Sequence, residues 1–328
     1  MVRRQRATRW RTAGVSTSPI AIAALTALGF LLPGVVGAGA YFLPLFVTAA
    51  KQTSQRPTPA ATATAVAPGS PFTILLLGSD NDTKFPKDKV LTQSMILVRV
   101  NPTTHAVTML SIPRDLWVPL STGHSAKIDL AYQEGGAKAA IDTVAANFKV
   151  KIDDYAWIGL KGLVQLIDSV GGIDVVTTNP VLDDFYPSDL TGGHPYGFQR
   201  VAVLAGPQHL DGATALKYVR SRHGDLIGDY GRSQRQQQVL LAIRQKAKQL
   251  SPTDVPDLAA AFNGELKTSM GVARVRELLP LAAGLTNQDS IKQIVLLEPY
   301  TSLGTVDSQS VVLANWGLIR PLVAQYFR

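Results

Sequence analysis

The sequence predicts an α/β domain in which a sheet core is flanked by helices. Short apolar runs rich in β-branched residues alternate with longer stretches of helix-forming residues, and this alternation is typical of a sheet covered by helices. The run at 71–82 is apolar and ends in glycine and acidic residues, as expected of a buried strand that delivers polar groups to its carboxyl edge. With 328 residues, the chain is long enough to bury a sizeable core.

The first half of the domain should contain three strands that follow one another closely. The first brings Asp80 and Asp82 to a loop, a turn separates the second from the third, and the third runs directly into Arg114 and Asp115. The expected elements are strands at 71–82, 94–102 and 105–113, a helix from 127 to about 147, and a strand at 155–158.

The second half should alternate between helices and strands around one long loop. A helix at 161–170 is expected to end at Gly171 and Gly172, because glycine adopts the left-handed conformation of a C-cap. Residues 180–206 hold many prolines and glycines, which favours a loop that covers part of the molecule. The remaining expected elements are a strand at 173–178, helices at 210–220, 232–250 and 272–285, a strand at 291–299 and a helix at 311–327.

The residues before the domain predict a membrane anchor. Residues 1–18 are basic, and residues 19–49 form an uncharged apolar stretch that is long enough to cross a bilayer. The positive charges favour a single transmembrane helix at 19–49 with the N-terminus in the cytoplasm. Residues 50–71, rich in Pro, Thr and Ala, are typical of a flexible linker to an extracytoplasmic domain at 72–328. A cleaved signal peptide is the competing interpretation, and the length of the apolar stretch favours an uncleaved anchor.

The charge distribution argues against a nucleic-acid partner. The chain carries a net charge of +8, but residues 1–71 contain seven Lys and Arg and no acidic residue, which leaves +1 for residues 72–328. A nearly neutral domain lacks the broad basic surface of a DNA-binding protein. The chain has no cysteine, which excludes disulfides, thiolate metal sites and cysteine nucleophiles.

The stretch from 216 to 238 concentrates arginines around a predicted glycine turn at Gly228 and Gly231. Arg220 and Arg222 leave the end of a helix that Asp211 should cap, while Arg232, Arg235 and Gln236 share one face of the next helix. Guanidinium groups bind phosphate oxygens bidentately and stay charged, so the stretch is compatible with a diphosphate site. Spacing alone leaves a solvated charged face as an equal alternative.

Several motifs occur in this chain in one order: GSD at 78–80, SIPRD at 111–115, KIDLAYQEGG at 127–136, GLVQLIDSVGGIDV at 162–175, and LDGATALKYVRSRH followed by GDYGRSQRQQ at 210–237. With the anchor and linker, they resemble the LytR-CpsA-Psr family of bacterial envelope proteins over essentially all of 72–328. The resemblance implies an α/β/α sandwich with a central mixed β-sheet and a groove for a polyprenyl chain. It also implies a phosphotransferase, dependent on Mg²⁺ or Mn²⁺, that moves an anionic glycopolymer from the membrane lipid undecaprenyl-pyrophosphate to a peptidoglycan hydroxyl.

The resemblance also assigns roles to individual residues. It places the family's diphosphate-binding arginines at Arg220, Arg222 and Arg232. The glutamine that accompanies them is Gln236, and further substrate contacts come from Lys127 and from Arg114 of SIPRD. The first metal-binding carboxylate is Asp80, and the residues expected in catalysis are Asp80, Arg114 and Arg220.

One position departs from the family pattern. Where the family usually carries an aspartate between two Ser or Thr residues, this chain reads LTQSM at 91–95, so Gln93 takes the place of the acid. An amide oxygen is a neutral ligand, and Mg²⁺ sites normally rely on one or two carboxylates. We therefore expect a metal site at Asp80 and Gln93 that carries less charge than usual.

Other functions stay open at this point. A polyprenyl-pyrophosphate hydrolase would use the same site with water as the acceptor. A membrane-bound transcriptional attenuator or a non-catalytic lipid binder would catalyse no reaction. The general base is also undecided between Asp80, Asp115 and Asp225. The sequence contains no P-loop, H-E-x-x-H or G-x-S-x-G motif.

Overall fold

The computed structural model describes residues 69–80, 90–177, 179–188, 196–221, 228–247, 265–270 and 291–328. Within these ranges, no helix is both long and apolar enough to cross a membrane. The predictions that fall outside the described residues are the tail, the transmembrane helix and nearly all of the linker, the helix at 272–285, and the roles of Asp82, Arg222 and Asp225.

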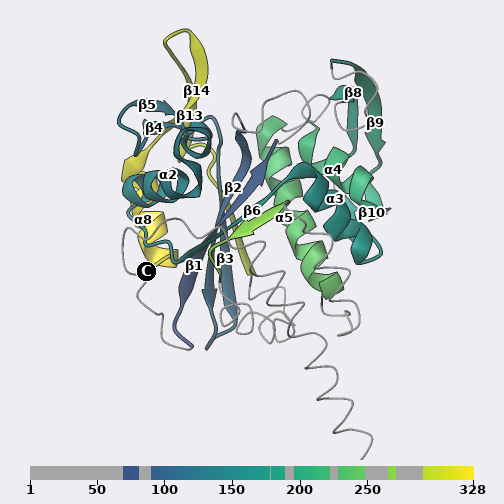
Figure 1. The fold of residues 1–328 in the computed structure, drawn as a ribbon, viewed down its shortest axis with the longest axis horizontal. Coiled ribbons are helices and arrows are strands. Elements are labelled where there is room, and N and C mark those ends of the chain that lie inside the picture. The colour runs from purple at the N-terminus through teal and green to yellow at the C-terminus, as the bar shows by residue number, and fades with distance from the viewer. Residues whose placement is uncertain are drawn as a thin grey trace, which may run out of the picture. The chain divides into compact units, whose positions relative to one another are not determined.

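A six-stranded sheet forms the centre of the domain (Figure 1), in the order β11-β6-β1-β2-β3-β12. The pairs β1–β6 and β3–β12 are parallel, whereas the other neighbouring pairs are antiparallel. The mixed sheet implied by the family resemblance is therefore confirmed. Its strands are β1 (Phe72–Ser79), β2 (Thr92–Asn101), β3 (Ala106–Ile112), β6 (Asp154–Ile158), β11 (Leu266–Thr268) and β12 (Ile291–Val295).

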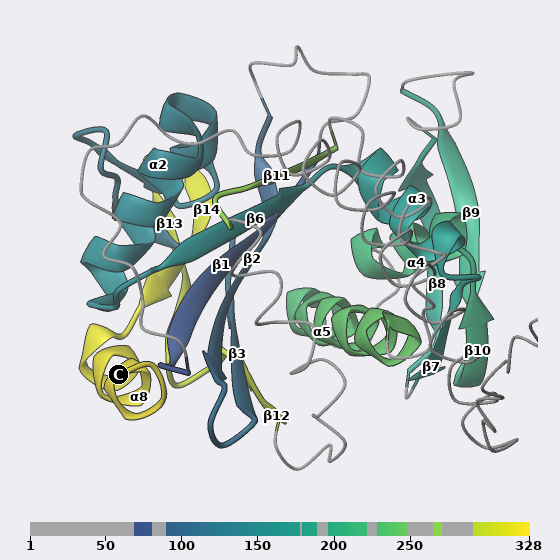
Figure 2. The ribbon, with the colours of Figure 1, turned by 60° about the horizontal axis from the view of Figure 1, so that its bottom comes forward.

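Helices cover both faces of this sheet (Figure 2). α2 (Leu130–Phe148) and α8 (Trp316–Tyr326) lie on one face, and α5 (Gly228–Ala247) lies on the other. Successive side chains of a strand point to opposite faces, so Leu75 packs into the core under α2 and α8 while Ile74 joins the core beside α5. The result is an α/β/α sandwich, as expected.

A second, smaller hydrophobic core lies on the side of α5 that faces away from the central sheet (Figure 1). Two helices, α3 (Leu160–Ser169) and α4 (Gly212–Arg220), pack there with α5 against two-stranded sheets. The sheets pair β7 (Ile173–Thr177) with β10 (Gly206–Leu210) and β8 (Val181–Pro187) with β9 (Phe198–Val203). α4 ends at Arg220, so this second core carries one of the predicted site arginines.

The long loop predicted at 180–206 is wrong, because most of its described residues belong to strands β8, β9 and β10. In β8 the side chains of Val181 and Tyr186 are buried, whereas Leu182 and Phe185 are exposed. Its proline, Pro187, is the last residue of the strand, where a missing backbone N–H is tolerated. Pro187, one of the residues that suggested a loop, therefore marks the end of a strand.

Other boundaries also differ from the predictions. The C-terminal helix starts only at Trp316, because β14 (Gln309–Ala314), rich in β-branched residues, pairs with β13 (Thr301–Val306). Likewise, β5 (Ser125–Lys127) pairs with β4 (Trp117–Pro119) before α2 begins. The expected turn at Gly231 is wrong as well, since α5 already begins at Gly228.

Two predicted helix ends are confirmed. The carboxylate of Asp211 accepts a hydrogen bond of 2.7 Å from the backbone N–H of Thr214 and caps α4. Gly171 and Gly172, which follow α3, both have a positive φ, 74° and 82°. These signals come from backbone chemistry within a few residues, which explains why the sequence alone locates them.

Candidate active site

Three strands of the central sheet bring polar residues together at one edge. β1 is followed by Asp80, the antiparallel β2 begins beside it with Gln93 and Ser94, and β3 leads into Arg114. In the β1–β2 pair, Gly78 lies opposite Ser94, and a Cβ atom at Gly78 would come within 3.1 Å of the Ser94 Cβ. The GSD motif thus lets β1 and β2 approach closely where the polar side chains gather.

Asp80 and Arg114 are joined through the amide of Gln93. Asp80 is only 6% exposed, and its Oδ1 accepts from the backbone N–H of Leu91 at 2.9 Å. Its Oδ2 accepts from Gln93 Nε2 at 2.7 Å, and Gln93 Oε1 accepts a hydrogen bond from Arg114 Nη1. A buried carboxylate, a neutral amide and a guanidinium therefore form one continuous chain.

This chain continues through Asp115 to Lys127. Arg114 Nε donates to Asp115 Oδ2 at 3.3 Å, and Lys127 Nζ donates to Asp115 Oδ1 at 3.0 Å. Burial acts to raise the pKa of Asp115, but the hydrogen bond from Lys127 and the positive charges of Arg114 and Lys127 outweigh it and lower the pKa. Asp115 therefore stays ionised and fixes both cations.

Asp129 is a further acidic residue of this region that the sequence did not single out. It is 5% exposed, and its backbone carbonyl accepts from the Thr92 hydroxyl at 3.2 Å. Burial raises the pKa of its carboxyl to about 6, partly offset by the charge of Arg114. Its position in the KID motif was the available signal, although that motif drew attention only to Lys127.

Two arginines of the 216–238 stretch, Arg220 of α4 and Arg232 of α5, approach the same edge. Arg220 lies over the ring of Tyr186, with its Cζ 5.6 Å from the ring centroid, and its Nη1 lies 3.5 Å from the Tyr186 hydroxyl oxygen. Arg232 is 8% exposed and stands one helical turn before Gln236 on α5. The Ser94 hydroxyl donates to Gln236 Oε1 at 2.9 Å, which ties α5 to β2. Tyr186 belongs to the segment predicted as a loop, and so the sequence reading missed it.

Arg235, the fourth arginine of the stretch, has a structural role. It is 5% exposed, and it donates to the carbonyl oxygens of Tyr218 at 2.6 Å and Ser221 at 2.7 Å. These carbonyls belong to the C-terminal end of α4, which a positive charge stabilises. The guanidinium of Arg235 thus fixes the position from which Arg220 extends.

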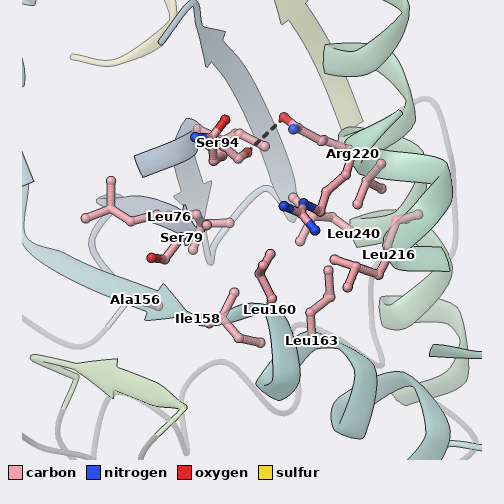
Figure 3. Close-up of a pocket in the computed structure, with 18 of the residues that line it drawn as sticks. Leu76, Ser79, Ser94, Ala156, Ile158, Leu160, Leu163, Leu216, Arg220 and Leu240 are labelled. Carbon is pink, nitrogen blue, oxygen red and sulfur yellow. Dashed lines mark hydrogen bonds between the residues drawn. The ribbon is translucent and has the colours of Figure 1, made fainter. Parts of the chain in front are cut away.

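Two cavities of different character meet at this edge. One, of 220 Å³, is lined mainly by apolar side chains between the sheet and α3, α4 and α5, with Arg220 at its wall. Figure 3 shows Leu76, Leu160, Leu163 and Leu216 around it, and its dashed line marks the Ser94–Gln236 hydrogen bond. The other, of 510 Å³, is lined by Arg114 and Arg232 together with residues of β12, β13 and the segment between them. Gln93, Ser94 and Gln236 line both cavities and so form the boundary between them.

The oxygen atoms at this edge offer limited support for a metal ion. Among the described residues, no group of three or more His, Cys, Asp or Glu is arranged to hold one. Asp80 accepts two hydrogen bonds and keeps lone pairs for a cation, whereas the amide oxygen of Gln93 faces Arg114. A Mg²⁺ ion at Asp80 would thus need further oxygen ligands from water or a bound anion, which is a usual mode for this ion.

The sequence model of the LytR_cpsA_psr family matches residues 44–314. The chain belongs to this family. Its relatives include Biofilm regulatory protein A of Streptococcus mutans, which is 34% identical over 264 residues, covering 76% of this chain and 61% of that protein. They also include the polyisoprenyl-teichoic acid–peptidoglycan teichoic acid transferase TagU of Enterococcus faecalis, which is 31% identical over 74% of this chain and 76% of its own length.

Solved structures of LytR-CpsA-Psr proteins share the fold. The crystal structure of Bacillus subtilis TagV superposes with a TM-score of 0.63 at 26% identity, covering 79% of this chain and 98% of that one. The chain spans only about 61% of the length of the Streptococcus mutans relative, so the activity of that whole protein is not transferred to this chain by similarity.

Proposed function

We propose that this chain is an extracytoplasmic phosphotransferase that moves an anionic glycopolymer from a polyprenyl diphosphate carrier to a hydroxyl group of peptidoglycan. The observation that carries the proposal is the meeting of an apolar cavity and an arginine-lined cavity at Gln93, Ser94 and Gln236. A polyprenyl diphosphate has the same division, an apolar tail joined to a charged head. The name of the Enterococcus faecalis relative, a transferase of polyisoprenyl-linked teichoic acid to peptidoglycan, supports the same substrate class.

The positions of the arginines suggest how the head group lies. Arg220 lines the apolar cavity, so we assign it to the phosphate that carries the lipid. Arg114 and Arg232 line the polar cavity and are assigned to the phosphate that carries the glycan, with Lys127 as a further contact held through Asp115. Arg222, outside the described residues, keeps its proposed place beside Arg220.

The proposed step is an in-line displacement at phosphorus. The acceptor hydroxyl oxygen forms a bond to the glycan-side phosphorus while the bond to the bridging oxygen breaks. The hydroxyl proton passes to solvent water, and polyprenyl monophosphate leaves with the electron pair of the broken P–O bond. Negative charge grows on the lipid-side phosphate, so a guanidinium already fixed there, as Arg220 is over Tyr186, lowers the barrier.

Acidic residues serve supporting roles in this proposal. The lowered pKa of Asp115 makes it a weak base, so we assign it to holding Arg114 and Lys127. Asp80 is the residue that would hold Mg²⁺ or Mn²⁺. When bound, such an ion would neutralise charge on the diphosphate oxygens.

We also propose that residues 19–49 anchor the chain in the bacterial cell membrane, with the domain on the outer side. The supporting observation is the uncharged apolar stretch that follows a basic tail. This location brings the domain to both the lipid carrier and peptidoglycan. A topology reporter fused to the C-terminus should give an extracytoplasmic signal, and a cytoplasmic signal would contradict the proposal.

Product analysis tests the proposed reaction. The full chain in detergent, with a polyprenyl diphosphate-linked glycan and a peptidoglycan acceptor, should release polyprenyl monophosphate and form a phosphodiester between the two glycans. Phosphate-ended glycan without a diester, even at high acceptor concentration, would identify a hydrolase instead. An absence of turnover at every divalent ion concentration would overturn both enzymatic hypotheses, the phosphotransferase and the hydrolase.

A further inference from the structure

The orientation of the Gln93 amide is fixed by the chemistry of its two neighbours. An ionised carboxylate only accepts hydrogen bonds, and a guanidinium only donates them. The amide NH₂ group must therefore face Asp80 and the amide oxygen must face Arg114, as the structure has them. Turning the amide over would place donors against donors and acceptors against acceptors, so this side chain has one stable arrangement here.

The amide leaves part of the Arg114 guanidinium available to a ligand. Gln93 holds Nη1 and Asp115 holds Nε, while within the described ranges Nη2 makes no hydrogen bond. The side chain is only 11% exposed, and it lines the polar cavity. A guanidinium held at two nitrogens, with the third directed by its planar geometry, loses little entropy when it binds phosphate.

We propose that Gln93 is a positioning residue that lets this site bind a diphosphate group without a divalent cation. The inference rests on the proposed function, because it concerns the same head group. A carboxylate at position 93 would also pair with Arg114, but it would place a second negative charge beside buried Asp80. Two adjacent carboxylates repel each other unless a cation lies between them or one of them takes up a proton. The neutral amide makes both hydrogen bonds and leaves the site one unit more positive.

Two substitutions separate the hydrogen bonds of Gln93 from its charge. Gln93→Met keeps the length of the side chain and removes both bonds, and Gln93→Asp adds the charge. Gln309→Met, at an exposed position of β14, is the matched control. The probe is geranyl diphosphate, titrated by calorimetry into the full chain in detergent, once with EDTA and once with Mg²⁺.

Wild type and Gln309→Met should bind the probe in EDTA, and Mg²⁺ should strengthen their binding much less than it strengthens binding by Gln93→Asp. Gln93→Met should bind roughly tenfold more weakly in both conditions, since hydrogen bonds to charged groups are lost while the melting temperature stays close to that of wild type. Gln93→Asp should lose a similar factor in EDTA and recover it with Mg²⁺. A purely structural role for Gln93 does not produce this dependence on the cation.

Two sets of results would overturn the inference, and they have different consequences for the proposed function. If Gln93→Met binds as wild type does, or if Gln93→Asp binds as well in EDTA as in Mg²⁺, the bridge is not what positions Arg114 and the inference is overturned. The proposed function then stands, because wild type still binds the diphosphate. If wild type binds no diphosphate in either condition, the proposed function falls, and the inference falls with it.

Discussion

The two cavities that meet at Gln93, Ser94 and Gln236 are held in shape by different kinds of interaction. The walls of the apolar cavity are leucine, isoleucine and valine side chains that also belong to the packing between sheet and helices. The polar cavity is lined by Gln93 and Arg114, which belong to a chain of directional hydrogen bonds that runs from Asp80 to Lys127. Packing adjusts to small changes in shape, whereas a buried polar chain loses a partner with each substitution. The polar side should therefore be much less tolerant of mutation.

The largest effect is expected at Arg220, which lines the apolar cavity and is assigned to the phosphate that carries the lipid. Arg220→Ala should lower turnover of a polyprenyl diphosphate-linked glycan by about a hundredfold or more, because a fixed charge beside the leaving phosphate is removed. Arg200→Ala is a matched control, since that side chain is 79% exposed and pairs with Asp184 at the surface. Steady-state kinetics of the two variants decide the point, and equal losses would contradict the assignment.

A second effect, on stability, is expected only on the polar side. Burial raises the pKa of Asp129 to about 6, above its ordinary value of 3.8, so the folded state binds this proton more tightly than the unfolded state. The resulting stabilisation is complete below pH ~4 and is lost as the pH rises through about 6. Asp129→Asn should remove this dependence and be more stable than wild type at pH 7.5, by at most about 3 kcal/mol.

Denaturant unfolding at pH 4.5 and pH 7.5 measures this effect. The free energy of unfolding of Asp129→Asn should exceed that of wild type by a margin that grows as the pH rises. If Asp129→Asn were less stable than wild type at pH 7.5, the ionised carboxylate would instead be stabilised by its surroundings. Asp115 should behave in the opposite way, since its lowered pKa gives a stabilisation that is lost only as the pH falls below its ordinary value.

The polar side was also the side that sequence reasoning located best. Asp80 and Arg114 follow β1 and β3. Gln93 lies near the start of β2, Lys127 ends β5, and the hydrogen-bonded pairs that connect them are at most 21 residues apart in sequence. The orientation of the Gln93 amide depends on its two hydrogen-bond partners, Asp80 and Arg114. Only the structure shows that these two residues flank it. The family resemblance suggested Gln93 as a metal ligand, and its hydrogen bonds to Asp80 and Arg114 add a bridging role that the sequence did not predict.

The second core was predicted less well, for a physical reason. Between 180 and 206, Pro187 ends β8 and Gly206 begins β10, so a local interpretation takes residues at strand ends for loop signals. Burial of Val181 and Tyr186 against α4 and α5 decides the fold of this segment, and that is a contact between distant parts of the chain. Tyr186, which lies under Arg220, could only be found once that pairing was known.

On the apolar side we expect an intermediate effect that depends on the lipid. Leu163→Gln places a polar group in the wall of the apolar cavity and should raise the KM for a long polyprenyl diphosphate about tenfold, through lost apolar contact. Binding of inorganic diphosphate, which has no tail, should be unchanged. Leu182→Gln, at a side chain that is 56% exposed on β8, is the control and should leave both quantities unchanged. Equal weakening of both ligands by Leu163→Gln would instead indicate a general distortion of the site.

The smallest effect tests whether the hairpin β8–β9 contributes to the polar side through Tyr186. Tyr186→Phe keeps the ring under Arg220 and removes a hydroxyl whose distance from Nη1, 3.5 Å, indicates a weak bond, so turnover should fall less than about threefold. Tyr186→Leu removes the ring as well and should cost a few-fold more, mainly in kcat, because the charge beside the leaving phosphate is less well placed. Both variants should keep the tail-dependent part of binding, since Tyr186 does not line the apolar cavity. If Tyr186→Leu changed the KM for long polyprenyl substrates but not kcat, the hairpin would belong to the lipid side, and the division between the two cavities would have to be redrawn.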